Sequence, residues 1–245
     1  MSLNTPVTIL LAALPAIALL FYIYYKDKVN KEPISLLLKL FVFGMLIVIP
    51  VIIVEQIIDI FISFIPRGSI VSASLEAFIC AALTEELFKY LVVKKLTWNY
   101  PAFDSTFDGI VYCACVSLGF AAVENVMYAL SMGSHVLPYR AVLAIPGHFA
   151  FSLAMGVLYS RAKHIDAYNK NVGASYDYKP YLRYALIIPV VFHGFYDFCL
   201  MVKYEAFLLV YALFITFMYR YILKTIKVNS RNDRLFLWEK ETLTF

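Results

Sequence analysis

The sequence predicts an all-α protein, a polytopic bundle of about seven helices that crosses a membrane. Three observations predict this class. The first two are that 62% of the 245 residues are hydrophobic and that the mean hydropathy is +0.75. The third is that the apolar residues gather into long runs. Soluble domains average about 45–50% apolar residues, so the composition excludes an ordinary soluble fold. The length suits one helical bundle better than several domains.

Seven stretches are long enough to span the hydrocarbon core, which takes about 20 apolar residues in a helix. They are 6–25, 34–54, 72–94, 107–130, 140–161, 184–203 and 205–223. The first stretch lacks basic residues before it and is followed by lysines, which indicates a retained helix and not a signal peptide. We therefore predict a membrane bundle over 1–226 and a cytoplasmic tail over 227–245.

The placement of basic residues predicts the orientation. Lysine and arginine cluster after the first, third, fifth and seventh stretches, whereas the opposite loops hold only Arg67, Arg140 and Lys203. Because cytoplasmic loops carry the excess of these residues, we expect the N-terminus outside and the C-terminus in the cytoplasm. Residues 55–70 are then an outer amphipathic segment with a turn, and 162–182 is a flexible cytoplasmic loop.

Ionisable residues interrupt four consecutive apolar stretches. A charge in the bilayer core costs about 3 kcal/mol on insertion scales, so such residues ordinarily face a polar cavity between helices. The third stretch carries two adjacent glutamates and a lysine. The fourth stretch carries a glutamate, the fifth a histidine, and the sixth a histidine and an aspartate. These candidate site residues are Glu85, Glu86, Lys89, Glu124, His148, His193 and Asp197. They meet if the four helices pack around one cavity.

The residue types suit a metal-assisted hydrolytic centre. Glu124, His148 and His193 come from separate helices and could supply three ligands to a first-row metal ion, leaving a fourth position for water. Asp197 lies one turn after His193 on the same helical face, where it could orient the imidazole or share in binding.

The adjacent glutamates are candidates for the general base. One of Glu85 and Glu86 could take a proton from the attacking water. Lys89 lies three and four residues further along the same helix, within reach of both carboxylates. We expect it to neutralise one carboxylate and leave the other free to act, and the spacing alone does not say which.

Other reactive side chains are expected to have structural roles. The cysteines lie in apolar stretches without a zinc-binding spacing, two histidines lie in loops, one aspartate is placed to cap the fourth helix, and one glutamate lies at the outer interface. These residues are Cys80, Cys113, Cys115, Cys199, His135, His164, Asp108 and Glu76. The sequence has no Gly-rich phosphate loop and no basic patch with interleaved aromatics, so no nucleic-acid partner is expected.

Several motifs occur in a fixed order along the predicted core. They are Glu85-Glu86-x-x-Lys89, Phe107-Asp108-Gly109-Ile110-Val111-Tyr112, Gly119-Phe120-x-x-x-Glu124-Asn125, His148 followed by Gly156, and His193-x-x-x-Asp197. In this combination the chain resembles the PrsW family of intramembrane proteases, which are relatives of the CAAX prenyl protease and Abi group. In the CAAX relatives the first motif ends in arginine one residue later, and a histidine stands where Glu124 stands here. Both departures match the PrsW family.

The resemblance covers about 75–200 and implies a protease in the plasma membrane of a bacterium. It implies a membrane-anchored protein substrate, by resemblance an anti-sigma factor cut on its extracytoplasmic side at the start of a stress response. Zinc is the expected cofactor, and a glutamate-activated water without a metal is the alternative. Carried over by residue, Glu85 and Glu86 are catalytic, and Glu124, His148 and His193 are site or metal residues. With the helical spacing included, the predicted catalytic set is Glu85, Glu86, Lys89 and Asp197, and the predicted metal ligands are Glu124, His148 and His193.

Two other classes of protein could use the same buried residues. A non-catalytic membrane scaffold would form stable complexes without cleaving a substrate. A proton- or ion-coupled transporter would use the carboxylates for coupling, but the chain shows no internal repeat of the kind that inverted-repeat transporters contain. The sequence leaves the oligomeric state open.

Overall fold

The computed structural model describes residues 4–202 and 204–236, and these residues form a helical bundle without any β-strand. Six helical segments among them are long and apolar enough to cross a membrane. The predicted all-α polytopic bundle is therefore confirmed. The predicted third span, 72–94, lies in a further helical segment in which three elements follow one another without a break from Ile70 to Thr97.

The elements follow the predicted order closely. They are α1 (Thr5–Lys26), α2 (Ile34–Leu46), α3 (Val48–Ile62), α4 (Ile70–Leu75), the π-helix η1 (Glu76–Leu83), α5 (Thr84–Thr97), α6 (Asp108–Met132), the 3₁₀-helix η2 (Ser134–Val136), α7 (Leu137–Val142), α8 (Ala144–Val172), α9 (Lys179–Met201) and α10 (Ala206–Arg231).

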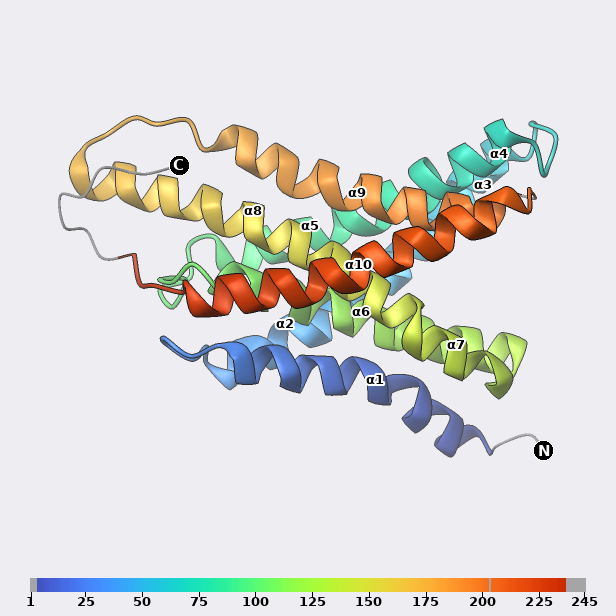
Figure 1. Ribbon diagram of the computed structural model, residues 1–245, viewed down its shortest axis with the longest axis horizontal. Helices are drawn as coiled ribbons and strands as arrows, with labels where there is room; N and C mark the ends of the chain where they lie inside the picture. The colour runs from blue at the N-terminus through green and yellow to red at the C-terminus, as the bar shows by residue number, and fades with distance from the viewer. Residues whose placement is uncertain (1–3, 203, 237–245) are drawn as a thin grey trace.

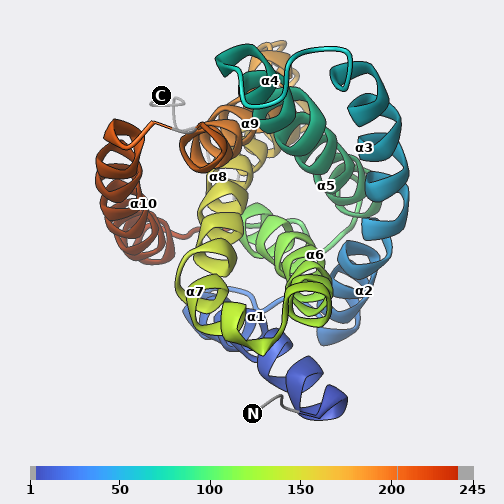
Figure 2. The same ribbon diagram turned by 90° about the vertical axis from the view of Figure 1, so that its right-hand side faces the viewer.

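Helix α6 lies at the centre of the bundle, with α1, α2 and α8 packed around it (Figure 2). Helix α8 packs in turn on α9, and α9 packs on η1. One end of the molecule carries the N-terminus, the α3–α4 turn and α7, and the other carries the α1–α2 and α8–α9 connections and the end of α10 (Figure 1). The basic residues assign this second end to the cytoplasm.

Close contact between α2 and α6 follows from glycines on both helices. A Cβ atom on Gly119 would lie 2.1 Å from the backbone oxygen of Phe41, and one on Gly44 would lie 2.1 Å from the backbone oxygen of Val116. Small residues allow helix backbones to approach closely within a membrane, where packing drives helix association. As a result, 78% of the most apolar window of α6 is buried inside the protein, against 11% for α10.

The loop predicted over 162–182 is wrong for most of its length, because α8 continues to Val172. Beyond the apolar stretch, Lys163 donates a hydrogen bond to the backbone oxygen of Trp98 at 2.6 Å, and Lys170 pairs with Asp166 at 2.7 Å. The helix ends at Gly173, whose φ of 71° lies in the left-handed region that glycine adopts readily. Polar composition therefore did not distinguish a solvated helix from a loop.

The outer segment predicted over 55–70 is also partly wrong. Helix α3 runs to Ile62, so Glu55 and Asp59 lie within a membrane helix and the turn begins only at Ser63. The Val and Ile residues around Glu55 continue the helix through this acidic position.

The end of α10 lies later than the predicted boundary at 226. The helix continues to Arg231, and the segment after it returns to the body of the protein, where the Phe236 amide donates to the Asp104 oxygen at 2.7 Å. The predicted cytoplasmic tail over 227–245 is thus helical in its first part. Its last part, 237–245, lies outside the described residues.

A cluster of buried acids lies at the cytoplasmic end, between the α1–α2 turn and the start of α6. Asp27 is 0% exposed and Glu32 is 2% exposed. The Tyr112 hydroxyl donates to Glu32 at 2.6 Å. Asp108, the first residue of α6, accepts hydrogen bonds from the Ser105 amide and hydroxyl. It therefore holds the turn before the helix and does not cap α6 as predicted.

Burial changes the protonation of this cluster. It raises the pKa of Glu32 to about 9, with the neighbouring Asp108 carboxylate acting in the same direction, and raises the pKa of Asp27 to about 6. No lysine or arginine among the described residues forms an ion pair with Glu32, so a proton neutralises it near pH 7.

The pH dependence of stability tests this protonation. Because the unfolded pKa of glutamate is about 4.3, the folded state binds the Glu32 proton more tightly and loses stability as pH rises toward 9. The Glu32→Gln variant stays neutral, so we expect its thermal unfolding midpoint to fall less between pH 6.5 and 9 than that of the wild type. Glu205→Gln, at an exposed position, should follow the wild type. Parallel curves for Glu32→Gln and the wild type would contradict the assignment.

Candidate active site

The ammonium group of Lys89 lies at the centre of the predicted site. It is 2.9 Å from a Glu85 oxygen, 2.8 Å from a Glu86 oxygen and 3.2 Å from His148 Nδ1. All four side chains are buried, and Glu86 is 0% exposed. The lysine therefore compensates both carboxylates, where the sequence predicted that it would neutralise one.

His193 reaches the same point from α9. Its Nδ1 lies 3.1 Å from the Lys89-bound oxygen of Glu86, and its Nε2 lies 3.2 Å from Asp197. One donor atom each from Glu85, Glu86, His148 and His193 lies within 4.8 Å of the others. The structure thus brings together residues from α5, α8 and α9, as the sequence predicted.

Glu124 occupies a different position from the one expected of a metal ligand. Its carboxylate lies on the far side of His148, 2.8 Å from Nε2, and the same oxygen accepts a hydrogen bond from Arg140 at 2.9 Å. A carboxylate at Nε2 holds the proton on that nitrogen and directs the Nδ1 lone pair toward Glu85 and Lys89. Asp197 makes the corresponding contact with His193, which is one of the two roles predicted for it.

The π-helix η1 sets the direction of the two glutamates. It ends at Leu83, directly before Thr84, Glu85 and Glu86. A π-turn holds one more residue than an α-turn, so the residues after it are rotated by about 100°, the angle of one α-helical residue. The Thr84 hydroxyl donates to the backbone oxygen of Ile79, five residues earlier, at 3.3 Å. Nothing in the sequence pattern signalled this element.

A glycine next to His193 allows α9 to approach η1. A Cβ atom at Gly194 would lie 2.3 Å from Phe78 Cδ1, closer than side chains permit. His193, the residue before Gly194, lies 3.1 Å from Glu86 at this close approach. The corresponding glycine beside the other histidine, Gly147, is less crowded, because its nearest neighbour would lie 3.5 Å away.

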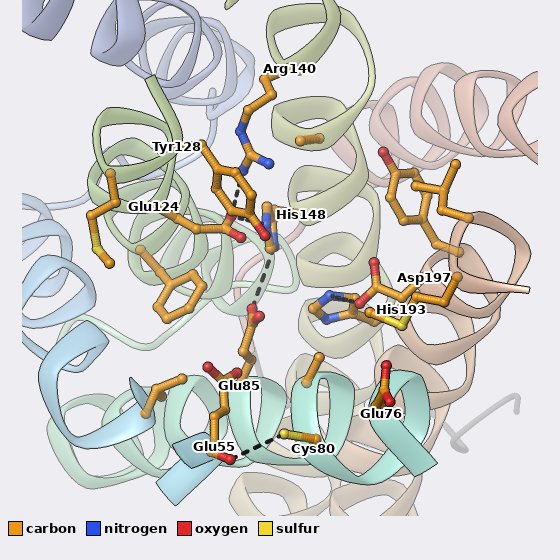
Figure 3. A pocket seen from close by; sticks show the side chains of 18 of the residues that line it. Glu55, Glu76, Cys80, Glu85, Glu124, Tyr128, Arg140, His148, His193 and Asp197 are labelled. Atoms are coloured by element: carbon orange, nitrogen blue, oxygen red, sulfur yellow. Dashed lines mark hydrogen bonds and ion pairs between the residues drawn. The ribbon is translucent and has the colours of Figure 1, made fainter. Parts of the chain in front are cut away.

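A cavity of about 940 Å³ opens above the cluster, on the side of α3 and α7. Figure 3 shows Glu85, His148 and His193 in the middle of this cavity, with Glu55 and Glu76 on the η1 side. A cavity of this size holds a ligand as large as a short peptide segment, since sites for drug-sized ligands have volumes of about 300–1,000 Å³.

Sequence reasoning missed several polar residues that line this cavity, of which Glu55 and Arg140 bear most on the site. Glu55 was placed in an outer segment, although the unbroken Val and Ile residues around it signal a continuing helix. Arg140 was counted only as an outer-loop charge, yet it binds Glu124, donates to Asn125 at 2.5 Å and stacks on Tyr128 at 3.9 Å. Its position directly before an apolar stretch was the available signal.

Two carboxylates and two imidazoles buried around one point, beside a peptide-sized cavity in a membrane bundle, define a candidate hydrolytic site. Residues 32–223 match the family model described as "PrsW family intramembrane metalloprotease". The chain belongs to the PrsW family. It is a membrane-embedded protease and a multi-pass bacterial membrane protein. The resemblance predicted from the motifs is confirmed.

Several curated relatives agree with this assignment. The chain is 38% identical over 189 residues to "Protease PrsW" of Geobacillus kaustophilus, with 77% of each chain covered. It is 36% identical over 187 residues to "Protease PrsW" of Oceanobacillus iheyensis, covering 76% of this chain and 79% of the relative. For "Protease PrsW" of Halalkalibacterium halodurans the identity is 28% over 223 residues, covering 91% and 97%. No solved structure matches the chain.

The two site glycines provide a matched pair of variants. Gly194→Ala should displace α9 from η1 and lower activity by about a hundredfold, because a misplacement of 1 Å is enough for such a loss. Gly147→Ala adds the same methyl group beside His148 without a clash and should retain activity. Protease assays of both variants, with Phe78→Leu added to Gly194→Ala as a rescue, check this. Equal activity in the two single variants would show that the Phe78 contact does not position His193.

Proposed function

We propose that this protease cuts a membrane-anchored protein on its extracytoplasmic side, using a glutamate-activated water. The convergence of Glu85, Glu86, His148 and His193 at the inner end of the outer cavity supports this function most strongly. By family analogy we further propose that the substrate is an anti-sigma factor whose cleavage begins a stress response.

We assign the general base to Glu85. Its carboxylate lines the cavity, whereas Glu86 does not line it and is 0% exposed. Glu86 is also held by both Lys89 and His193. A water entering from the cavity therefore meets Glu85 first, and Glu85 can take its proton as the water attacks the peptide carbonyl.

The buried donors suit a divalent metal ion, for which we propose zinc. Two imidazoles and carboxylate oxygens are typical zinc ligands. Glu86 Oε2 is buried and accepts no hydrogen bond from the described residues, so this oxygen is free to bind an ion. His148, His193 and Glu86 would hold the ion, which supplies Lewis acidity and makes water more acidic.

The surrounding residues orient these ligands. Glu124 holds His148, and Asp197 holds His193, through the ring nitrogens that face away from Glu85 and Glu86. Such carboxylate–histidine contacts fix the ring tautomer and orientation. We therefore assign Glu124 a positioning role and not the ligand role suggested by spacing. In the metal-free alternative, His148 and His193 would bind the water and the oxyanion directly.

Substitution of the acids and imidazoles tests this mechanism. We expect Glu85→Gln and His193→Ala to lower cleavage of a co-expressed single-span anti-sigma factor reporter by at least about a hundredfold, the contribution of a general base. Both variants should remain inserted in the membrane and folded. Their thermal unfolding midpoints, measured in detergent and compared with that of the wild type, check this. Glu205→Gln, at an exposed position outside the cavity, is the control. Full cleavage by Glu85→Gln would reject the assigned base.

Elemental analysis of purified protein separates the metal mechanism from the metal-free one. We expect zinc in the wild type at one ion per chain, and loss of zinc in the Glu86→Gln and His193→Ala variants. Asp197→Asn should still bind zinc, but with an affinity lower by about ten- to a hundredfold, which is the usual effect of losing a carboxylate that orients a ligand. A chelated, metal-free wild type that still cleaves the reporter would favour the alternative without a metal.

A further inference from the structure

The outer cavity is strongly acidic. Six carboxylate side chains line it, and Arg140 is the one lysine or arginine among its lining residues. The six are Glu55, Asp59, Glu76, Glu85, Glu124 and Asp197. They come from α3, η1, α5, α6 and α9, so the negative charge surrounds the space and is not confined to one helix.

Most of these acids already have a partner. Asp59 pairs with Arg67 at 3.2 Å, and Glu124 pairs with Arg140 at 2.9 Å. Glu85 and Asp197 contact Lys89 and a site histidine, respectively. Glu76 accepts a hydrogen bond from the Ser72 hydroxyl. Glu55 differs from the other five, because no cation and no side-chain hydrogen-bond donor among the described residues pairs with its carboxylate.

Glu55 is nevertheless fixed in place. It lies in the middle of α3, and its backbone oxygen accepts a hydrogen bond from the Cys80 thiol of η1 at 3.4 Å. In Figure 3 the Glu55 carboxylate lies on the Glu85 side of η1. An acid at membrane depth is costly unless a partner or a function retains it. The Glu55 carboxylate has no partner among the described residues and lines the cavity, so it is available to a group that enters from outside the chain.

The walls of the cavity indicate the kind of partner. Apolar side chains such as Val51, Ile52 and Leu143 alternate with the acids, and Tyr128 and Tyr211 add aromatic surface. Lysine and arginine combine an alkyl stem with a charged head, so they can satisfy both kinds of surface. A small inorganic cation would leave most of the 940 Å³ and its apolar lining without contact.

We propose that Glu55 is a specificity-determining residue that binds a lysine or arginine side chain of the substrate, close to the scissile bond on its extracytoplasmic side. This inference deepens the proposed function and rests on it. The substrate class is a membrane-anchored protein with a basic juxtamembrane segment outside the bilayer. Glu55 contacts the substrate but not the bond that is cut.

Binding measurements on the Glu85→Gln protein in nanodiscs test the proposal without requiring cleavage. The probes are three fluorescent single-span peptides that differ only in an outer juxtamembrane pair of lysines, glutamines or glutamates. At physiological salt we expect the lysine peptide to bind at least about tenfold more tightly than the glutamate peptide, which is one decade in Kd. Adding Glu55→Gln should remove most of this preference, and Glu55→Lys should reverse it.

A matched control variant and several contrary outcomes complete this test. Glu205→Gln removes the same charge from an exposed position outside the cavity and should leave the preference unchanged. Equal affinity for the three peptides, no binding of any of them, or an unchanged preference in Glu55→Gln would overturn the proposal. Displacement of the lysine peptide by low concentrations of Ca²⁺ would show an inorganic cation site instead. Failure of the proposed function would appear separately, as undiminished reporter cleavage by Glu85→Gln.

Discussion

Two adjacent carboxylates buried at membrane depth need compensation within the protein, because each uncompensated charge costs about 3 kcal/mol or more. Lys89 supplies it, with one ammonium group in contact with Glu85, Glu86 and His148. The spacing of three and four residues places this charge on the same face of α5 as both acids. The interaction does more than stabilise the acids, since it gathers the groups that would otherwise repel one another around one point. His193 then approaches a carboxylate whose position is already fixed.

The backbone geometry of the bundle serves this arrangement. The π-helix η1 turns Glu85 and Glu86 toward α8 and α9, and Gly194 lets α9 come close enough for His193 to reach them. On the opposite side of the centre, Gly119 brings α2 against α6. In a membrane, where lipid is as apolar as the helix surfaces, such small residues and interhelical polar contacts specify which helices are neighbours. Site and fold are therefore determined by the same few contacts.

Much of the architecture could be predicted from the sequence, because hydropathy fixes membrane spans and the cost of buried charge selects the site residues. The sequence did not predict the three-dimensional geometry of the site. The spacing of Glu124 suggested a ligand, but its side of α6 faces the far nitrogen of His148. Arg140 and Glu55 were assigned by their place between apolar stretches, and their tertiary contacts could not be read from composition. The π-helix η1 packs against α9, a contact between distant parts of the sequence, and local pattern did not reveal it either.

The bundle contains two layers of buried acids, the cytoplasmic cluster and the candidate site, which lie at different heights along α6. Their negative charge is compensated in different ways. Asp108 at the start of α6 belongs to the cytoplasmic cluster, where Glu32 is neutral because it holds a proton. Glu124 lies about 24 Å further along the helix at 1.5 Å per residue, in the layer compensated by Arg140 and Lys89. Between them α6 is fully packed, with Ala114 and its neighbours buried. Water therefore has a route to the site from the outer cavity but not through this packed layer, which supports a cut on the extracytoplasmic side.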